Sequence, residues 1–256
     1  MRCWMKLHLS WNLNKSLIAT FLLLGVLSQA NALEFSSGDA QTKLIELYTS
    51  EGCSSCPPAD RWLTQLKSEP GLWRDFVPVA FHVDYWDYIG WQDRFAQPSH
   101  AARQRQHAKL GNVKTVYTPG FVVDGAEWRG WFRGQTLPQE ISMAGRLSGD
   151  LQGDKLHLRY NPNQSHEQII ATVVLLGADL SSEVKRGENA NKTLNHDFAA
   201  LYEKSLAMKF RPENGTFASE TIISIPSDAK AIAVWVAPNA NLRPIQATGA
   251  WLVADL

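Results

Sequence analysis

Cysteine is scarce in this sequence, and its scarcity narrows the possible chemistry. Three cysteines occur in 256 residues, and Cys3 lies near the start, so Cys53 and Cys56 form the one pair in the rest of the chain. A structural zinc site needs four ligands, and the sequence has no second cysteine pair to supply them, which argues against a zinc module. The question is whether this pair is a redox site, part of a metal site or a structural disulfide.

An excess of positive charge is also missing. Lysine and arginine together number 25, as do aspartate and glutamate. Removal of the first 32 residues would take away three basic residues and no acidic one, which leaves a mildly acidic chain. Such a chain lacks the basic excess that neutralisation of phosphates demands, so we expect no binding to nucleic acid.

The sequence has no hydrophobic run long enough to cross a membrane as a helix. The apolar run from Ser16 to Leu27 has 12 residues, whereas a spanning helix needs about 20. Basic residues precede this run, and a small-x-small Ala-Asn-Ala site follows it and ends at Ala32. We therefore predict that residues 1–32 are a cleaved signal peptide, that no membrane span remains, and that the protein is periplasmic or secreted.

The spacing of apolar residues predicts alternating strands and helices up to about residue 150. Pro57 suits the first turn of a helix, where a missing N–H costs nothing, and Asp124-Gly125 is the signal for a tight hairpin. Ser99 and Gly111 are expected to cap a second helix. The expected elements are strands at 44–48 and 76–86, helices at 57–69, at 100–110 and from Thr136, and a hairpin around 124–125.

The pattern changes after residue 150 to short strand-like runs separated by turn residues, which indicates a β-sandwich. Residues 183–210 fit either a strand or a helix. The strand–helix–strand start implies a right-handed parallel pair, to which the hairpin adds an antiparallel edge, as in a thioredoxin-like core. We predict an α/β fold, with a thioredoxin-like domain at 33–150 followed by a mainly β, sandwich-like domain at 151–256.

Cys53 and Cys56 stand where the first strand gives way to the first helix. Two cysteines three residues apart on a helix's first turn can close a small disulfide, and the free N–H groups there stabilise a thiolate on the first of them. We therefore predict that Cys53 is an exposed attacking thiolate and that Cys56 resolves the mixed disulfide. No basic residue lies between Lys43 and Arg61, so nearby charge does not favour a strongly lowered pKa.

Two other uses of the same sulfurs remain open. A disulfide that closes so short a loop stabilises a fold little, yet it could remain oxidised in a non-enzymatic interaction protein. His82 follows at the end of the second strand, and Cys53, Cys56 and His82 together could hold a soft metal such as Cu(I). The plainer role for His82 is that of a hydrogen-bonded strand histidine. The redox hypothesis itself requires no cofactor.

Several other polar and aromatic residues need an interpretation. An aromatic group could form a docking surface or lid over the disulfide, or it could be core between the two domains. The aromatic residues are Tyr85, Trp86, Tyr88 and Trp91. On the second helix we expect His100 and His107 to be solvated, and the basic face of Arg103, Arg105 and Lys109 to be surface, with reception of an acidic partner as the alternative.

Five segments resemble a secreted bacterial family of thioredoxin-like proteins that is catalogued as a domain of unknown function, family 1223. They are ELYTSEGCSSCPPAD, FHVDYWDYIGWQDRFA, ARQRQHAK, VYTPGFVVDG and RGENANKTL. The resemblance covers nearly all of the chain after residue 32, and it implies a thioredoxin-like fold followed by a β-rich region. It implies no particular substrate.

The wider resemblance to thioredoxins adds two expectations. It implies that the Thr118-Pro119 bond is cis and that Pro119 lies beside the cysteines and receives the backbone of a partner protein. The buried acid of thioredoxins, six residues before the first cysteine, is Leu47 here, with Glu46 on the opposite face of a regular strand. Proton transfer by a carboxylate at that position is therefore not implied.

Together these observations predict a periplasmic or secreted thiol–disulfide oxidoreductase. Its partners would be protein thiols or disulfides, and whether it oxidises or reduces them stays open. The expected catalytic residues are Cys53, Cys56 and Pro119. The residues expected to contact the partner are Thr118, Tyr85, Trp86 and Trp91.

Overall fold

Strands are the main secondary structure of the protein. The structure is a computed structural model that describes residues 1, 32–138, 142–238 and 241–252. Of the chain, 44 % lies in strands and 15 % in helices, so the protein is mostly β. The predicted signal peptide falls outside the described residues apart from its two end residues. No helix in the described ranges is long and apolar enough to cross a membrane.

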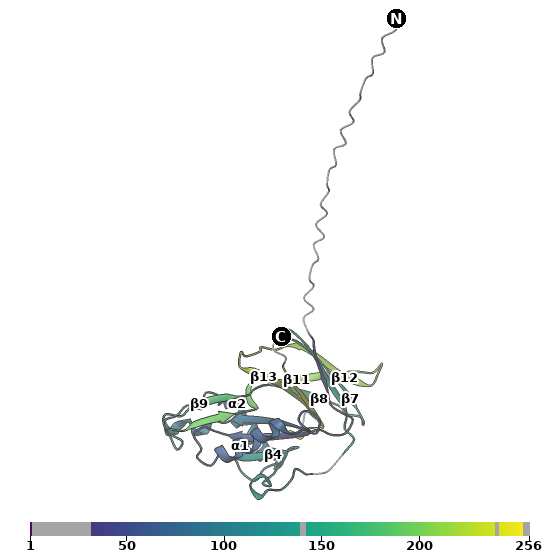
Figure 1. Cartoon of the computed structure of the whole chain (residues 1–256). Helices are drawn as coiled ribbons and strands as arrows, with labels where there is room; N and C mark the ends of the chain where they lie inside the picture. Colours follow the sequence, from purple (N-terminus) through teal and green to yellow (C-terminus); the bar gives the residue numbers. More distant parts are fainter. Residues whose placement is uncertain (2–31, 139–141, 239–240, 253–256) are drawn as a thin grey trace.

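The helices lie at one end of the molecule, beside the first strands (Figure 1). The strand–helix–strand unit and the hairpin are as predicted: β2 and β3 pair in parallel, and β4 pairs antiparallel with β2 and β5. The second helix differs at its start, because Pro98 occupies the first turn and Gln97 is the N-cap instead of Ser99. The elements are β2 (Lys43–Thr49), α1 (Pro57–Gln65), η1 (Leu66–Ser68), β3 (Phe76–His82), η2 (Asp84–Ile89), α2 (Pro98–Lys109), β4 (Gly120–Val123), β5 (Ala126–Glu127) and η3 (Trp131–Arg133).

The other end of the molecule consists of strands alone. One layer holds the order β1-β6-β7-β12, and β8, β13 and β14 lie against it. A separate two-stranded ribbon, β9 with β10, lies near α1. These strands are β1 (Leu33–Ser36), β6 (Gly145–Gln152), β7 (Lys155–Pro162), β8 (Ile169–Gly177), β9 (Leu180–Glu183), β10 (Thr193–His196), β11 (Ala199–Arg211), β12 (Thr216–Ile222), β13 (Ala229–Pro238) and β14 (Gln246–Trp251).

The long strand β11 joins the two ends and overturns the predicted fold class. It pairs in parallel with β3 at Ala199 and Ala80, antiparallel with β8 over most of its length, and with β12 through its last three residues. The result is one mixed sheet of twelve strands. The prediction of an α/β thioredoxin-like domain followed by a separate β domain is therefore wrong. The sequence pattern did not decide between strand and helix for residues 183–210, which include most of β11. The pairing of β11 with β3 and β8 connects the two predicted domains.

The helix predicted from Thr136 is also wrong where the structure describes it. Residues 136–138 lie outside any helix, residues 139–141 are not described, and Leu147 lies in β6. Leu147 and Leu151 fit a helix and a strand equally well by spacing. Gly149 lies between them against Phe35 of β1, a close packing that only a strand pairing creates.

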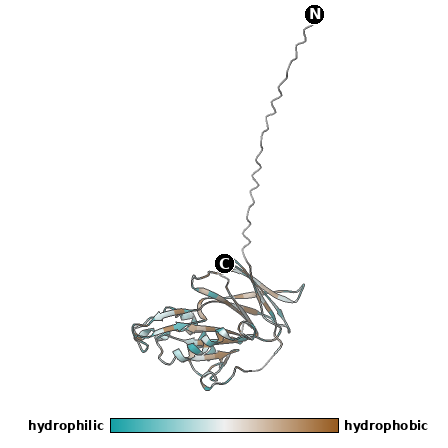
Figure 2. Ribbon diagram, viewed as in Figure 1, coloured by the Kyte–Doolittle hydropathy of each residue, from teal (hydrophilic) through white to brown (hydrophobic). Residues whose placement is uncertain are grey.

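Two hydrophobic cores lie on opposite faces of β8 and β13. Val173 and Leu175 face the core shared with β6 and β7, whereas Val174 and Leu176 face the core shared with β2 and β3. Strands covered on both faces have continuous apolar runs, and the sequence IIATVVLLG of β8 is such a run. Figure 2 shows these apolar strands passing through the middle of the molecule.

Candidate active site

The two cysteines lie at the start of α1. Cys56 is the N-cap residue, and its carbonyl oxygen accepts hydrogen bonds from the backbone N–H groups of Ala59 and Asp60 at 2.8 and 3.1 Å. Both thiols are free and buried, with exposed fractions of 1 % for Cys53 and 0 % for Cys56. Cys56 is at the helix start as predicted, whereas Cys53 lies in the turn three residues before it. The expectation of an exposed Cys53 is wrong.

An aromatic side chain and an isoleucine of η2 cover one side of the CxxC loop. A Cβ atom on Gly52 would lie 3.0 Å from Cβ of Trp86 and 3.2 Å from Cδ1 of Ile89. Trp86 also donates a hydrogen bond through Nε1 to Oγ1 of Thr118 at 2.7 Å. Gly52 therefore permits a close approach that a larger residue would prevent.

The turn between β9 and β10 holds the other side of the loop. Asn189 donates from Nδ2 to the carbonyl oxygens of Glu51 and Cys53, at 2.9 and 3.0 Å. The neighbouring Glu188 accepts a hydrogen bond from the backbone N–H of Ser54 at 2.9 Å. These contacts join residues more than 130 positions apart, and together with η2 they explain why Cys53 is buried.

The two thiols differ in their acidity. Hydrogen bonding from the Cys56 thiol, followed by that from Ser55 and Thr118, lowers the pKa of Cys53 to about 6, although burial acts in the opposite direction. Burial raises the pKa of Cys56 well above its ordinary value, and the charges of Cys53 and Asp60 raise it further. Counting nearby basic residues did not predict the Cys53 shift, because its donors are uncharged hydroxyl and thiol groups.

A surface groove lies beside the cysteines. The Thr118-Pro119 bond is cis, which confirms the isomer implied by the resemblance. Pro119 lines a hollow of about 450 Å³ together with Ser55, whose Oγ lies 3.3 Å from Sγ of Cys53. The remaining lining residues are Tyr117, Arg129, Trp131 and Phe132. The groove therefore ends one side chain away from the Cys53 sulfur.

Two buried histidine–carboxylate pairs lie behind the loop. Nδ1 of His82 is 2.7 Å from Asp93, and Nε2 of His196 is 3.1 Å from Glu51, with the two imidazole centres 4.8 Å apart. The backbone N–H of Glu51 donates to Asp93 at 2.9 Å, which links the pairs. Burial opposes the charged form of His82, but Asp93 raises its pKa overall.

Asp60 is a buried acid on α1, one turn after Cys56. Burial raises the pKa of its carboxyl group, and the charges of His196 and His82 only partly offset that effect. No described residue forms an ion pair with Asp60, since His82 and His196 pair with Asp93 and Glu51 instead. Asp60 is therefore a buried carboxyl group with a raised pKa, close enough to Cys56 for its charge to raise the pKa of that thiol.

The structure gives no support to the copper hypothesis. The described residues contain no group of three histidine, cysteine or carboxylate side chains that could hold a metal ion. His82 instead forms the pair with Asp93, which is the plainer role considered for it. Cys53, Cys56 and His82 are thus not brought together as ligands.

The aromatic residues divide into separate roles. Trp86 covers Gly52, and Trp91 donates from Nε1 to Glu51 at 2.7 Å. Tyr85 donates to Gln104 at 3.0 Å, and Gln104 donates to the carbonyl oxygen of Tyr117 at 2.6 Å. Tyr88, by contrast, is 82 % exposed. Three of the four therefore support the cysteine loop or the groove beside it.

The predicted solvation of α2 is wrong for His100, His107 and Arg103, whereas Arg105 and Lys109 are exposed as predicted. His100 is buried with Nδ1 2.9 Å from the carbonyl oxygen of His82. His107 and Arg103 both face Glu46, at 3.4 and 2.7 Å. Local spacing cannot show this arrangement, because the partner carboxylate comes from a strand more than 50 residues earlier.

Sequence reasoning missed several groups around the cysteines. These are Glu51, Asp60, Asp93, Asn189 and His196. Four of the five lie in segments of the resemblance: Glu51 and Asp60 in the CxxC segment, Asp93 in FHVDYWDYIGWQDRFA and Asn189 in RGENANKTL. Their contacts with one another and with His196 become known only from the tertiary structure.

Comparison with known proteins shows the family and the fold. Residues 44–237 match the family described as "Protein of unknown function (DUF1223)". A crystal structure of a protein from Agrobacterium tumefaciens is 23 % identical with a TM-score of 0.59, over 84 % of this chain and 96 % of that one. HBP35 of Porphyromonas gingivalis is 14 % identical with a TM-score of 0.55, over 84 % of this chain and 76 % of that one. No curated protein matches the chain.

These findings confirm the family named by the sequence resemblance. At such low identities the two solved structures show likeness of fold alone. The family match, in contrast, spans most of the chain and includes both cysteines, the groove and the turn that carries Asn189. The protein therefore belongs to the DUF1223 family.

Proposed function

We propose that this protein is a thiol–disulfide oxidoreductase that acts on protein thiols or disulfides in the periplasm or outside the cell. The observation that carries the proposal is the unequal pair of thiols at the start of α1. Cys53 has a lowered pKa and lies next to the Pro119 groove, whereas Cys56 has a raised pKa and lies deeper. An attacking thiolate and a resolving thiol require this division of properties.

The exchange uses two thiols of a partner and the Cys53–Cys56 disulfide. A partner thiolate attacks the Cys53 sulfur, the disulfide breaks, and the bonding electrons leave on Cys56, which takes up a proton. A second partner thiolate then attacks the mixed disulfide and releases Cys53 as a thiolate. The partner loses two electrons and the protein gains them, and the reverse sequence reduces a partner disulfide.

Asp60 is the group that we assign to the proton of Cys56. It lies one turn along the same helix, so it shares a face with that thiol. Its carboxyl group has a raised pKa, and its charge disfavours a Cys56 thiolate. A protonated Asp60 can supply the proton when Cys56 leaves and can accept it back when Cys56 attacks.

Access to Cys53 requires a local opening, because the residue is almost fully buried. A partner bound in the groove would contact Ser55 and Pro119, which line it. The covering groups on the way are Trp86 and the Asn189 turn. A flexible or partly unfolded thiol-containing segment fits such a narrow entrance better than a folded surface does.

Capture of mixed disulfides tests the proposal. A Cys56→Ser variant lacks the resolving thiol, so partner proteins should accumulate on Cys53 and be released by dithiothreitol. A Cys53→Ser variant is the matched control and should capture none. Purified wild-type protein should also catalyse oxidation of a dithiol peptide or reduction of its disulfide. Equal capture by both variants, together with no catalysis in either direction, would contradict the proposal.

A further inference from the structure

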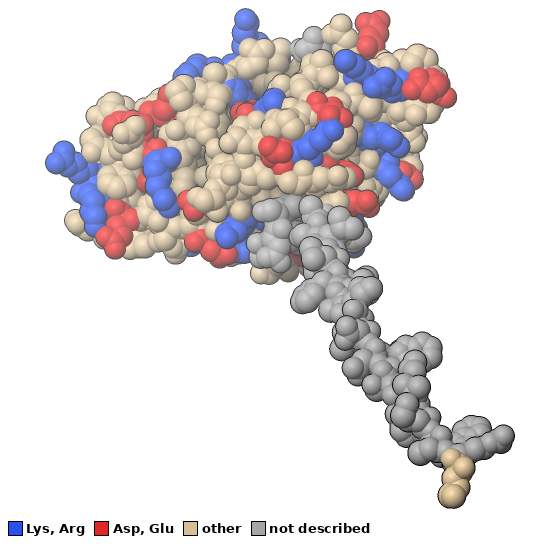
Figure 3. Space-filling model, turned by 90° about the horizontal axis from the view of Figure 1, so that it is seen from above, with Lys and Arg blue, Asp and Glu red and all other residues tan. Residues whose placement is uncertain are grey.

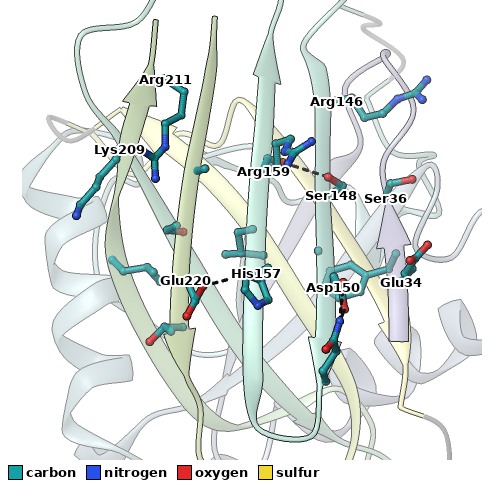
Figure 4. Close-up of a pocket in the computed structure, with 18 of the residues that line it drawn as sticks. Glu34, Ser36, Arg146, Ser148, Asp150, His157, Arg159, Lys209, Arg211 and Glu220 are labelled. Atoms are coloured by element: carbon teal, nitrogen blue, oxygen red, sulfur yellow. Dashed lines mark hydrogen bonds and ion pairs between the residues drawn. The ribbon is translucent and has the colours of Figure 1, made fainter. Parts of the chain in front are cut away.

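A second and larger hollow lies on the outer face of the strands at the end of the molecule away from α1. It measures about 1180 Å³ and is lined by β1, β6, β7, β12 and the end of β11. Figure 4 shows its side chains standing on neighbouring strands and facing the same side. Alternate residues of these strands fill the core, as the burial pattern of β6 shows, so the remaining residues must line the hollow.

Cross-strand pairing arranges these residues in rows. Ser148, Arg159, Ala218 and Lys209 are successive partners across β6, β7, β12 and β11, and Arg211 lies two residues beyond Lys209 on the same face. The small side chain of Ala218 leaves the space between the cations open. Three positive side chains therefore stand at one end of the hollow, Arg159 on β7 and Lys209 and Arg211 on β11 (Figure 4).

These three cations have no acidic partner. Arg159, Lys209 and Arg211 form no ion pair with any residue that the structure describes, whereas Arg146 at the edge of the hollow pairs with Asp39 at 3.2 Å. Glu220, in the row on the other side of Arg159, is 2.8 Å from Lys155. On the face seen in Figure 3, basic and acidic side chains are intermixed. Glu34, Asp150 and Glu220 also line the hollow, in the neighbouring row with His157, so the three unpaired cations form its positive end.

We propose that this hollow binds an acidic, extended peptide segment of a partner protein. Each exposed charge pair contributes little, so recognition here needs several anionic groups at once. Lys209 and Arg211 are two residues apart on one strand, about 7 Å, the spacing of alternate side chains on an extended peptide. The hollow exceeds the range of about 300–1,000 Å³ typical of small-molecule pockets, and charged side chains line it where such pockets are mostly apolar.

The site is independent of the cysteines. Its residues lie on β1, β6, β7, β11 and β12, and none of them takes part in the contacts that cover the CxxC loop. Binding can therefore be measured with both thiols alkylated, and its outcome is separate from that of the redox proposal.

Fluorescence anisotropy with a labelled decapeptide of alternating glutamate and alanine tests this site. We expect binding that weakens as salt rises and that exceeds binding of the matching lysine–alanine peptide at least about tenfold. A Lys209→Ser/Arg211→Ser double variant should bind about fivefold to tenfold more weakly. An Arg105→Ser/Lys109→Ser double variant on α2 carries the same change in charge and should bind like the wild type. Thermal unfolding of both variants checks that the fold is intact.

Three results would overturn the assignment. The first is equal binding of the acidic and basic peptides. The second is an equal loss of affinity in the two double variants, which would show an effect of overall charge. The third is tighter binding of heparin than of the acidic peptide through the same two residues, which would identify an anionic polysaccharide as the ligand.

Discussion

Glu46 and Asp60 are both buried carboxyl groups, and their surroundings shift their pKa values in opposite directions. Burial alone would raise the pKa of either group. At Glu46 the charges and hydrogen bonds of Arg103 and His107 outweigh burial and lower the pKa well below its usual range. At Asp60 no cation of the described residues forms an ion pair, and the pKa is raised. Burial therefore does not decide the charge of an acid, but the presence of a partner does.

The difference separates a structural role from a chemical one. Glu46 accepts hydrogen bonds from Arg103 at 2.7 Å and from Tyr48 at 2.9 Å, so its charge is fixed and it links β2 to α2. Asp60, with its raised pKa, is the carboxyl group to which we assign the proton of Cys56. In thioredoxins the buried acid lies on the strand before the cysteines. In this protein the acid that we assign to proton transfer, Asp60, lies on the helix after them.

Loss of Arg103 should have the largest effect on stability. An Arg103→Met variant keeps the bulk of the side chain but leaves the Glu46 carboxylate buried without its main partner. Arg103 is only 9 % exposed, so solvent offers little compensation. We expect the free energy of unfolding in urea to fall by about 3–5 kcal/mol. An Arg105→Met variant on the exposed side of α2 should change it by no more than about 0.5 kcal/mol. Equal losses in the two would show that Glu46 does not depend on its partner.

Loss of Asp60 should instead reduce activity. In an Asp60→Asn variant we expect thiol–disulfide exchange with a dithiol peptide to slow about 100-fold, because the proton of Cys56 loses its carrier. A Glu69→Gln variant removes an exposed acid shortly after α1 and should exchange at the wild-type rate. An unchanged rate in the Asp60 variant would show that Asp60 does not carry the proton of Cys56.

Substitution of Asp60 and substitution of Glu46 should change the pH dependence of the free energy of unfolding in opposite directions. A raised pKa in the folded state means that Asp60 costs stability as the pH rises above about 4. The lowered pKa of Glu46 means that its contribution is present at neutral pH and is lost on acidification below about 4.5. Urea unfolding at pH 3 and pH 7 measures both effects. Relative to the wild type, the free energy of unfolding of Asp60→Asn should be higher at pH 7 than at pH 3. A Glu46→Gln variant should show a relative loss.

A smaller effect is expected at Cys56 itself. The negative charge of Asp60 helps to raise the pKa of this thiol. In a Cys53→Ser background, which leaves one thiol, the Asp60→Asn substitution should lower that pKa. Thiolate absorbance at 240 nm against pH measures it. A pKa that does not move would mean that Asp60 and Cys56 do not interact.

The local elements around the cysteines could be predicted from the sequence. Pro57, the apolar stripe of α1 and the Asp124-Gly125 turn are short-range signals, and the structure has the helix and the hairpin at those places. The cis bond at Pro119 came from the resemblance alone. The helix and the hairpin depend on a few neighbouring residues, which is why a single sequence reveals them.

The overall fold and the burial of the site could not be predicted in this way. The twelve-stranded sheet depends on the pairing of Ala199 with Ala80, and the cover of Cys53 depends on Asn189. Both contacts join residues more than 100 positions apart. Hydrophobic periodicity describes which face of a strand is buried, but it does not say which strand lies beside it.

The hydrogen bonds of Asn189 mean that the cysteine loop cannot be separated from the rest of the protein without loss. A fragment that stops at residue 150 would keep both sulfurs, Asp60 and the groove, and it would look complete by motif. It would lack the amide that holds the carbonyl oxygens of Glu51 and Cys53, and it would lack the imidazole that faces Glu51. Transplanting the CxxC segment into another scaffold would meet the same difficulty, since its chemistry is completed by a remote turn.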